Sequence, residues 1–304
     1  QDFLERLLFE IRDKFSIDHI WISIIEESPI AKQLHDIQDS ELLKTATAFV
    51  PQKKFLSVTR NSRSPLLANK NLEVFQALVP EISTFEIGSI AIAPITLDGM
   101  VIGSINQADN DKKRFQPGID TSLLEQLALK VSLCLSNVTA HEQLKFLAFH
   151  DPLTGLLNRG VMERILEREF QRAKRYQMEL SLLFLDLDDF KSINDTFGHN
   201  NGDRALCQVS DCLTRLKRDS DIVARFAGDE FVVILPSTSK SQAEHYVNRV
   251  TRLLDSTPLS ANDTLFYVNL SYGIATVSEP GIDSSKSFLK ATDKRLYQAK
   301  QKKQ

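Results

Sequence analysis

Apolar residues recur along the chain with two different periods, and the changes of period predict its elements. In residues 2–15 they fall three or four positions apart, which predicts an amphipathic helix. HIWISII (19–25) is a short apolar run typical of a strand, and GSIAIAPI and MVIGSINQ, joined by TLDG, predict a hairpin over 88–107. No single period dominates between residues 28 and 84.

A long connector helix is predicted over about 119–148, because no glycine or proline follows Thr121 in this stretch. Its apolar residues alternate at spacings of three and four, as in a coiled-coil seam. The seam residues are Leu124, Leu127, Val131, Cys134 and Val138. Two interpretations carry equal weight. The helix packs on its own domain through this seam, or it also pairs with the same helix of a second copy.

Pro152 and Gly155 interrupt this helix, and we expect a domain boundary near residue 145. Beyond it, helical and strand patterns alternate, which predicts an α/β (α+β) domain with helices over one sheet. The expected strands are 180–187, two runs around Ala227–Glu230, and 265–277, and the longer helices are 159–177, 200–217, 239–255 and 286–300. The chain is therefore expected to contain two domains, 1–140 and 145–304.

Composition narrows the class of protein. Of 304 residues, 42% are hydrophobic and 25% charged, which is typical of a globular protein. The net charge of −3 gives no electrostatic case for a nucleic-acid partner. Three cysteines without a CxxC pair, and no apolar run near the ~18 residues of a membrane helix, favour a cytoplasmic protein. The chain begins at Gln1, which leaves open a membrane segment upstream.

Carboxylates gather at two strand ends. The run LSLLFLDLDDF leads directly into Asp186, Asp188 and Asp189, and DIVARFAGDEFVVILP carries Asp229 and Glu230 at a tight turn. Partly desolvated carboxylates repel one another, and a divalent cation would relieve that repulsion. Mg²⁺ is usually held by one or two carboxylates together with substrate phosphates. The alternative interpretation is solvated turn acids and a helix N-cap at Asp188 or Asp189.

Three separated motifs resemble the GGDEF family of diguanylate cyclases, and they occur in that family's order. They are DPLTGLLNR (151–159), FKSINDTFGHNNGD (190–203) and AGDEF (227–231). The resemblance covers about residues 145–300. It implies a palm-like domain with a mostly antiparallel central sheet that condenses two GTP into cyclic di-GMP and acts as a homodimer, since the product has two phosphodiester bonds.

The same resemblance assigns roles to individual residues. Two Mg²⁺ (or Mn²⁺) ions per active site would be held by Asp186, the Leu187 carbonyl and Asp229. Asp229 would also take the proton of the attacking 3′-hydroxyl, and Glu230 is the second acid of the signature. The residues implied in binding GTP are Phe190, Lys191, Asn194, Asp203, Ala227, Gly228 and Lys300, among which Lys191 and Lys300 contact phosphate and Asn194 and Asp203 contact guanine.

Arg218 and Asp221 resemble the family's RxxD product-inhibition site, and the alternative is a solvated loop. Two departures from the family pattern stand out. Ala227 replaces the first glycine of the signature, and the terminal YQAKQKKQ lacks the usual arginine, for which Lys302 or Lys303 are the candidate substitutes. These departures favour a rival function, a catalytically silent receptor for cyclic di-GMP. A second rival, an enzyme that makes another cyclic dinucleotide, is opposed by Asp203.

The first domain carries no catalytic signature. The order of its predicted elements, and the runs GSIAIAPI, MVIGSINQ and FQPGIDTSLLEQL, resemble a GAF-like sensor domain of the DUF484 type. Such domains bind small molecules, dimerise, or do both. The resemblance implies a small-molecule or protein input of unknown identity.

Overall fold

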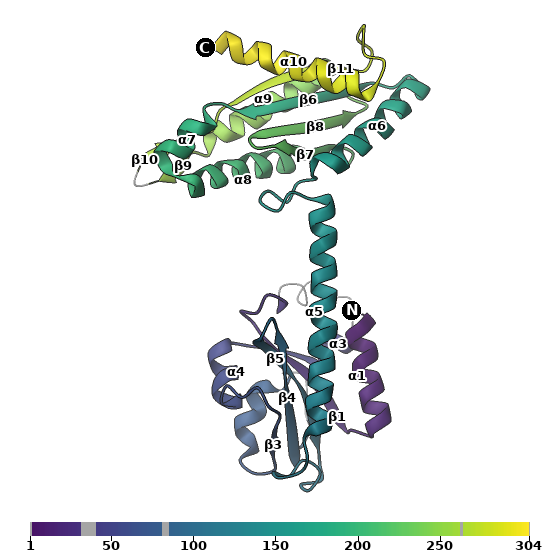
Figure 1. Ribbon diagram of the computed structural model, residues 1–304, viewed down its shortest axis with the longest axis vertical. Coiled ribbons are helices and arrows are strands. Elements are labelled where there is room, and N and C mark those ends of the chain that lie inside the picture. Colours follow the sequence, from purple (N-terminus) through teal and green to yellow (C-terminus); the bar gives the residue numbers. More distant parts are fainter. Residues whose placement is uncertain (1, 32–40, 81–84, 262–263, 304) are drawn as a thin grey trace. The chain divides into compact units, whose positions relative to one another are not determined.

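The computed structural model describes residues 2–31, 41–80, 85–261 and 264–303 (Figure 1). The chain divides into two compact units, Gln1–His141 and Glu142–Gln304. Parts of the region without a dominant period, residues 32–40 and 81–84, lie outside the described residues. In the ranges given above, no helix is long and apolar enough to cross a membrane.

The first unit is built on a five-stranded sheet in which all neighbours are antiparallel except β1 and β2. The predicted hairpin is confirmed, and its two turn residues, Asp98 and Gly99, both have positive φ, as a two-residue turn of this hand requires. In sheet order the strands are β2 (Thr47–Val50), β1 (His19–Ile25), β5 (Met100–Asp109), β4 (Ser89–Leu97) and β3 (Leu66–Ala68).

Both faces of this sheet are covered. Helices α1 (Asp2–Phe15) and α5 (Ser122–Phe149) pack on one face through a cluster that includes Leu8, Ile22 and Leu135. Figure 1 shows α4 on the opposite side of the strands. The second face is covered by α4 (Gln52–Thr59) and the 3₁₀ helix η1 (Leu72–Leu78), which contribute Phe55, Phe75 and Leu78 to a second cluster. The short α3 (Glu41–Thr45) contributes Leu43 to the cluster on the first face.

Helix α5 uses its predicted seam within its own unit. Val131 is 1% exposed among the strand residues of the first cluster, and Leu127 packs at the edge of the same cluster. The interpretation in which Val131 pairs with a second copy is therefore wrong, because the sheet already covers it. Leu129 and Leu133, on another side of the helix, are 60% and 55% exposed.

The second unit contains a four-stranded, fully antiparallel sheet in the order β11-β6-β8-β7, so the predicted α/β class with a mostly antiparallel sheet is confirmed. The predicted strand 265–277 is wrong in part. Residues 264–266 pair with β9 in a separate ribbon, because β6 ends at Leu187 and offers them no partner. The strands are β6 (Leu180–Leu187), β7 (Ile222–Ala227), β8 (Glu230–Pro236), β9 (Leu259–Ala261), β10 (Thr264–Phe266) and β11 (Leu270–Thr276).

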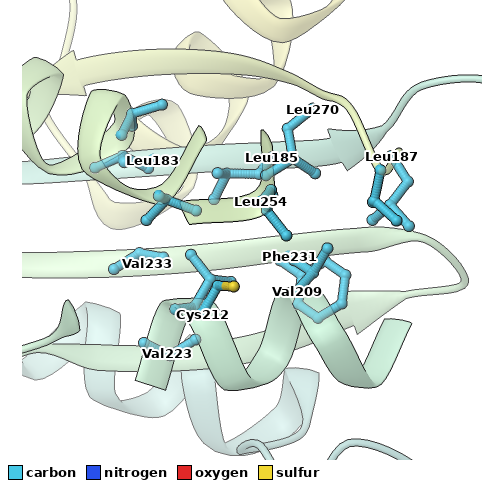
Figure 2. Close-up of a cluster of buried hydrophobic side chains, with 14 of the residues drawn as sticks. Leu183, Leu185, Leu187, Val209, Cys212, Val223, Phe231, Val233, Leu254 and Leu270 are labelled. Carbon is cyan, nitrogen blue, oxygen red and sulfur yellow. The ribbon is translucent and has the colours of Figure 1, made fainter. Parts of the chain in front are cut away.

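Apolar side chains bury both faces of the central sheet, which explains why its strands are continuous apolar runs. Leu183, Leu185 and Leu187 point toward α8 (His199–Leu216) and α9 (Lys240–Ser256), in the cluster drawn in Figure 2. Leu182 and Phe184 point to the other face, toward α6 (Arg159–Tyr176) and α10 (Ser285–Lys303). This alternation places Asp186 on the α6/α10 face, at the end of β6.

The burial of Val131 gives a direct test of how α5 packs. Val131→Lys places an unpaired charge in an apolar cluster and should lower the free energy of unfolding by about 3–5 kcal/mol. Gln126→Lys, at an exposed polar position of the same helix, should change it by less than about 0.5 kcal/mol. Urea unfolding of both full-length variants measures the difference. Equal effects would show that α5 does not use this seam within the unit.

Candidate active site

Three carboxylates meet where β6 ends beside the turn that joins β7 and β8. Asp186 pairs directly with Glu230 across the two strands. One position further, the Leu187 N–H donates to the Asp229 carbonyl at 3.3 Å. Asp186 is only 4% exposed. The register of one strand pair therefore brings together acids that are more than 40 residues apart in the sequence.

The last turns of α10 bring lysines to these acids. The Lys300 ammonium lies 2.5 Å from Asp186 Oδ1 as an ion pair without the angular geometry of a hydrogen bond, and Oδ1 has no hydrogen-bond partner in the described part of the chain. Lys303 donates to Asp188 Oδ2 at 2.7 Å and to the Leu270 carbonyl at 2.9 Å. Of the two candidate substitutes for the missing arginine, Lys303 thus reaches the end of β6.

The crowding of these acids shifts their proton affinities. Burial raises the pKa of Asp186 above its ordinary value, and Asp229 adds to this effect while Lys300 opposes it. Burial likewise raises the pKa of Glu230, with further contributions from Asp186 and Asp229. The charged forms of Asp186 and Glu230 are therefore destabilised by their surroundings. A bound cation would relieve this destabilisation.

The donor set fits a magnesium ion that shares its coordination with substrate. Among the described residues, no group of three or more His, Cys, Asp or Glu side chains is arranged to hold a metal by itself. Mg²⁺ needs only one or two protein carboxylates when phosphate oxygens and water complete its octahedron. The buried Asp186 and the neighbouring Asp229 could supply those ligands.

The signature turn is tighter than the sequence indicated. Only Gly228 and Asp229 lie between the strands, because Ala227 and Glu230 pair with each other as the last and first residues of β7 and β8. Gly228 has φ +50°, a backbone conformation that residues with a side chain rarely adopt. Ala227 is not among the residues of positive φ. The extra methyl of Ala227 therefore causes no backbone strain at this position.

The predicted guanine-binding residues lie close together on two packed helices. Asn194 is on α7 (Phe190–Phe197) and Asp203 is the fifth residue of α8, after a sharp bend at Gly198. A Cβ added at Gly202 would lie 2.0 Å from Asn194 Oδ1, so glycine at this position makes room for the Asn194 amide. Asp203 is exposed and follows Gly202 directly in α8.

The remaining predicted residues are placed as follows. Phe190 is half-buried at the start of α7, and Lys191 beside it is exposed. Asp189 occupies the N-cap position of α7, but its side chain makes no capping hydrogen bond. The alternative in which Asp189 serves as a helix cap is therefore not supported by its contacts.

Sequence reasoning missed the contact that holds the signature turn. Arg225, an isolated charge in the apolar run of β7, donates through Nε and Nη2 to the Gly228 carbonyl at 2.9 and 2.7 Å. Its Nη1 donates to Asp151 Oδ1 at 2.9 Å, and Thr154 donates to the same oxygen. The charged residue in an otherwise apolar strand was the available signal. This network ties the DPLTG loop to the backbone beside Asp229.

The RxxD pair forms a closed turn. Asp221 is 6% exposed and accepts from the Arg218 backbone N–H at 2.8 Å, while the Asp221 N–H donates back to the Arg218 carbonyl at 3.0 Å. The Arg218 residue itself is exposed. The structure therefore presents the arginine outward while the aspartate stabilises the loop that carries it.

Comparisons with known proteins agree with this geometry. Residues 148–304 match the family described as "Diguanylate cyclase, GGDEF domain". "Probable diguanylate cyclase DgcC" of Escherichia coli (strain K12) is 36% identical over 158 residues, which are 52% of this chain and 42% of that protein. "Diguanylate cyclase DgcP" of the same strain is 31% identical over 218 residues, which are 69% of this chain and 64% of that protein.

One solved structure extends the likeness beyond the sequence. The coiled coil and GGDEF domain of DgcB from Caulobacter crescentus, solved in complex with c-di-GMP, has a TM-score of 0.51 at 28% identity, and covers 60% of this chain and 95% of that chain. The chain spans less than two thirds of the length of either curated relative. Because the family match extends over residues 148–304, more than half of the 304 residues, the chain belongs to the GGDEF family.

Proposed function

We propose that this protein is a diguanylate cyclase, which condenses two GTP into cyclic di-GMP and releases two pyrophosphates. The observation that carries the proposal is the site at the end of β6. It joins the buried Asp186, the turn residue Asp229 and the Lys300 ammonium, in the same domain as the Asn194–Asp203 junction. Nucleotide phosphates fit the first group and a purine edge fits the second.

Guanine is the base that suits the helix junction. The Asp203 carboxylate can accept from guanine N1–H and the exocyclic amine together, and the Asn194 amide can add a further hydrogen bond. Adenine has neither donor on that edge, so it would leave Asp203 desolvated and unpaired. This chemistry favours GTP over ATP and opposes a mixed cyclic dinucleotide.

Several charged groups would act on the phosphates of GTP, each in a different role. Asp186, the Leu187 carbonyl and Asp229 would hold Mg²⁺ or Mn²⁺, two per active site, which would supply positive charge that favours deprotonation of the 3′-hydroxyl. Asp229 accepts the hydroxyl proton. Lys300 offsets negative charge on the departing pyrophosphate, and the exposed Lys191 on α7 is placed to do the same.

The product requires two copies of this domain, because it contains two phosphodiester bonds and each domain presents one GTP. Helix α5 offers exposed apolar residues for pairing with a second copy, in two groups separated by a gap of seven positions. The first group is Leu129 and Leu133, and the second is Ala140, Leu144 and Leu147. We infer that the first unit is the sensor and that it regulates how two cyclase domains meet through this helix.

A receptor without catalytic activity is the rival function, and Ala227 and the missing terminal arginine favour it. The structure weakens both arguments. Ala227 is accommodated in β7 without positive φ, and Lys303 reaches Asp188. A receptor that used only Arg218 and Asp221 would have no need of the buried Asp186 beside Asp229 and Lys300.

The cyclase proposal is tested by removing one carboxylate. Asp229→Asn should lower cyclic di-GMP formation from GTP and Mg²⁺ at least about a hundredfold, because an amide is a poorer metal ligand and accepts no proton. Asp255→Asn, an exposed residue near the end of α9, is the matched control and should retain full activity. Chromatographic identification of the product measures both. An Asp229→Asn protein with normal turnover would overturn the assignment, and a wild type without turnover would favour the receptor.

The Asp151–Arg225 pair predicts a pH-dependent loss of stability. Burial by itself raises the pKa of Asp151, but hydrogen bonds from Thr154 and Arg225 outweigh it and lower the pKa below the ordinary 3.8. The stabilisation is therefore present above pH 3.8 and is lost as the pH falls through the lower, folded-state value. Asp151→Asn should cost about 1–3 kcal/mol at neutral pH.

That difference between wild type and Asp151→Asn should begin to shrink as the pH falls below 3.8, and should be smallest below the lower folded-state pKa, where the wild-type carboxyl is also protonated. Urea unfolding at neutral pH and at acid pH provides the measurement. The Asp255→Asn variant again serves as control and should track the wild type at both. A difference that persists unchanged in acid would mean that the charge of Asp151 is not what stabilises the loop.

Product inhibition through the RxxD turn is tested at the arginine. Arg218→Ala should raise the cyclic di-GMP concentration needed for half-inhibition by about tenfold or more, because a charged hydrogen bond to phosphate or guanine is lost. Turnover without product should stay unchanged. Arg215→Ala, also exposed and in the last turn of α8, is the matched control. Identical inhibition curves for all three proteins would show that this turn is only a surface loop.

A further inference from the structure

A small cavity in the first unit lies between the sheet and the start of α5. Its volume is about 210 Å³, and its walls are mainly aliphatic and aromatic. It is lined by Ile17, Leu67, Gln107, Arg114, Phe115, Ile119, Asp120, Leu123, Leu124 and Leu127. Two of these apolar side chains, Ile119 and Leu123, are 40% and 69% exposed. A cavity with exposed apolar residues on its wall gains from an apolar occupant that covers them.

One uncharged polar side chain, Gln107 on β5, lines the cavity. The residue is only 5% exposed and makes no side-chain hydrogen bond to any described residue, but its polar atoms are not fully buried, so they remain accessible from the cavity. Its neighbours across the sheet, Ile20 and Ala91, are both apolar. An amide that is accessible from a cavity can exchange its hydrogen bonds with water for hydrogen bonds with a ligand. Gln107 is therefore available to a polar group of a molecule that enters the cavity.

On the opposite face of the same sheet, the buried polar side chains have hydrogen-bond partners within the protein. Ser104 donates to Asn106 Oδ1, the Asn106 amide donates to Ser23, and Ser23 donates to the Leu78 carbonyl of η1. These polar side chains are fully buried and their hydrogen bonds close among themselves. They leave no group for a ligand. Gln107 differs from these residues, because it lines the cavity and makes no side-chain hydrogen bond to a described residue.

We propose that this cavity is a binding site for a small uncharged molecule that is largely apolar and carries one hydroxyl or carbonyl group for Gln107. A carboxylate is disfavoured, because Arg114 is already ion-paired with Asp109 at 3.3 Å and Asp120 adds a negative charge to the wall. Benzene fills an apolar cavity of about 150 Å³, so this cavity suits a molecule of roughly eight to ten non-hydrogen atoms.

The position of the cavity gives its occupant a direct contact with α5. Leu123, Leu124 and Leu127 belong to the first two turns of that helix, and the helix continues without interruption to Phe149. An occupant that packs against these leucines would fix the start of α5 on the sheet. Binding at this site does not depend on the proposed cyclase activity. Only an effect of binding on turnover rests on that proposal.

The test is calorimetric titration of the full-length chain with benzyl alcohol and with acetophenone, which carry a hydroxyl and a carbonyl on an apolar ring. Toluene, without a polar group, and benzoate, with a charge, are the comparison probes. We expect saturable binding of the first two at one site, binding of toluene weaker by about tenfold, and no binding of benzoate. Absence of saturable binding by every uncharged probe would overturn the proposal and leave a cavity that holds water only.

Variants then locate the site. Gln107→Leu should weaken benzyl alcohol and acetophenone by about tenfold while it retains toluene, because only the amide is lost. Gln116→Leu makes the same change at an exposed loop position and should alter nothing. Leu124→Trp should abolish binding of all three by filling the cavity. Unchanged affinities in both Gln107→Leu and Leu124→Trp would overturn the site.

Thermal unfolding monitored by circular dichroism confirms that each variant is folded, and Gln107→Met replaces Gln107→Leu if the latter is not. Turnover of GTP is measured separately with and without acetophenone. A protein that binds the probe and makes no cyclic di-GMP would contradict the proposed function while supporting this site. A protein that makes cyclic di-GMP but binds no probe would do the reverse.

Discussion

Electrostatic repulsion among buried carboxylates is the constraint that organises the second unit. Asp186 and Glu230 face each other across a strand pair, Asp229 lies one residue away, and burial raises the pKa of the first two. Such an arrangement is tolerated only where positive charge is available, from lysine, from a metal, or from both. The fold supplies part of it through Lys300 and leaves Asp186 Oδ1 without a hydrogen bond for the remainder.

The elements around this site are arranged to keep the acids in place. Two apolar layers bury the sheet on both faces, so the strands that carry Asp186 and Glu230 have little freedom to separate. Arg225 holds the Gly228 carbonyl and is itself held by Asp151. The last turns of α10 bring Lys300 to Asp186 and Lys303 to Asp188. Rigid support of this kind is what positions charged groups for phosphate chemistry.

Helix α5 has one side that is buried in the first unit and another side that is exposed. Val131 and Leu135 bury one side of it against the sheet of the first unit, while Leu129 and Leu133 leave another side exposed. Its first turns form a wall of the cavity above Gln107, and its last turn receives hydrogen bonds from Asn158 at the start of the family domain. A ligand in the first unit and a second copy of the chain would therefore both act on the same helix.

The sequence by itself determined most of the elements and the family. Apolar periodicity gave the helices α5, α6 and α8 and the strands β1, β4, β5, β6 and β8 close to their observed bounds, because each element buries a face whose period is local. Motif order identified the GGDEF domain, and Asp186, Asp229 and Lys300 were all predicted as site residues. Gly228 was correctly predicted at the tight turn, since its φ is a property of a few neighbouring residues.

Tertiary structure decided which face of each helix or strand packs against which other element. The seam through Val131 was equally suited to a sheet or to a second helix, and only the observed packing chose the sheet. The strand predicted over 265–277 was divided because its pairing partner β6 ends at Leu187. The Arg225–Asp151 contact joins residues 74 positions apart, and the unpaired Gln107 is visible only once α5 closes over the sheet. These features depend on contacts between distant segments, which no local period or spacing encodes.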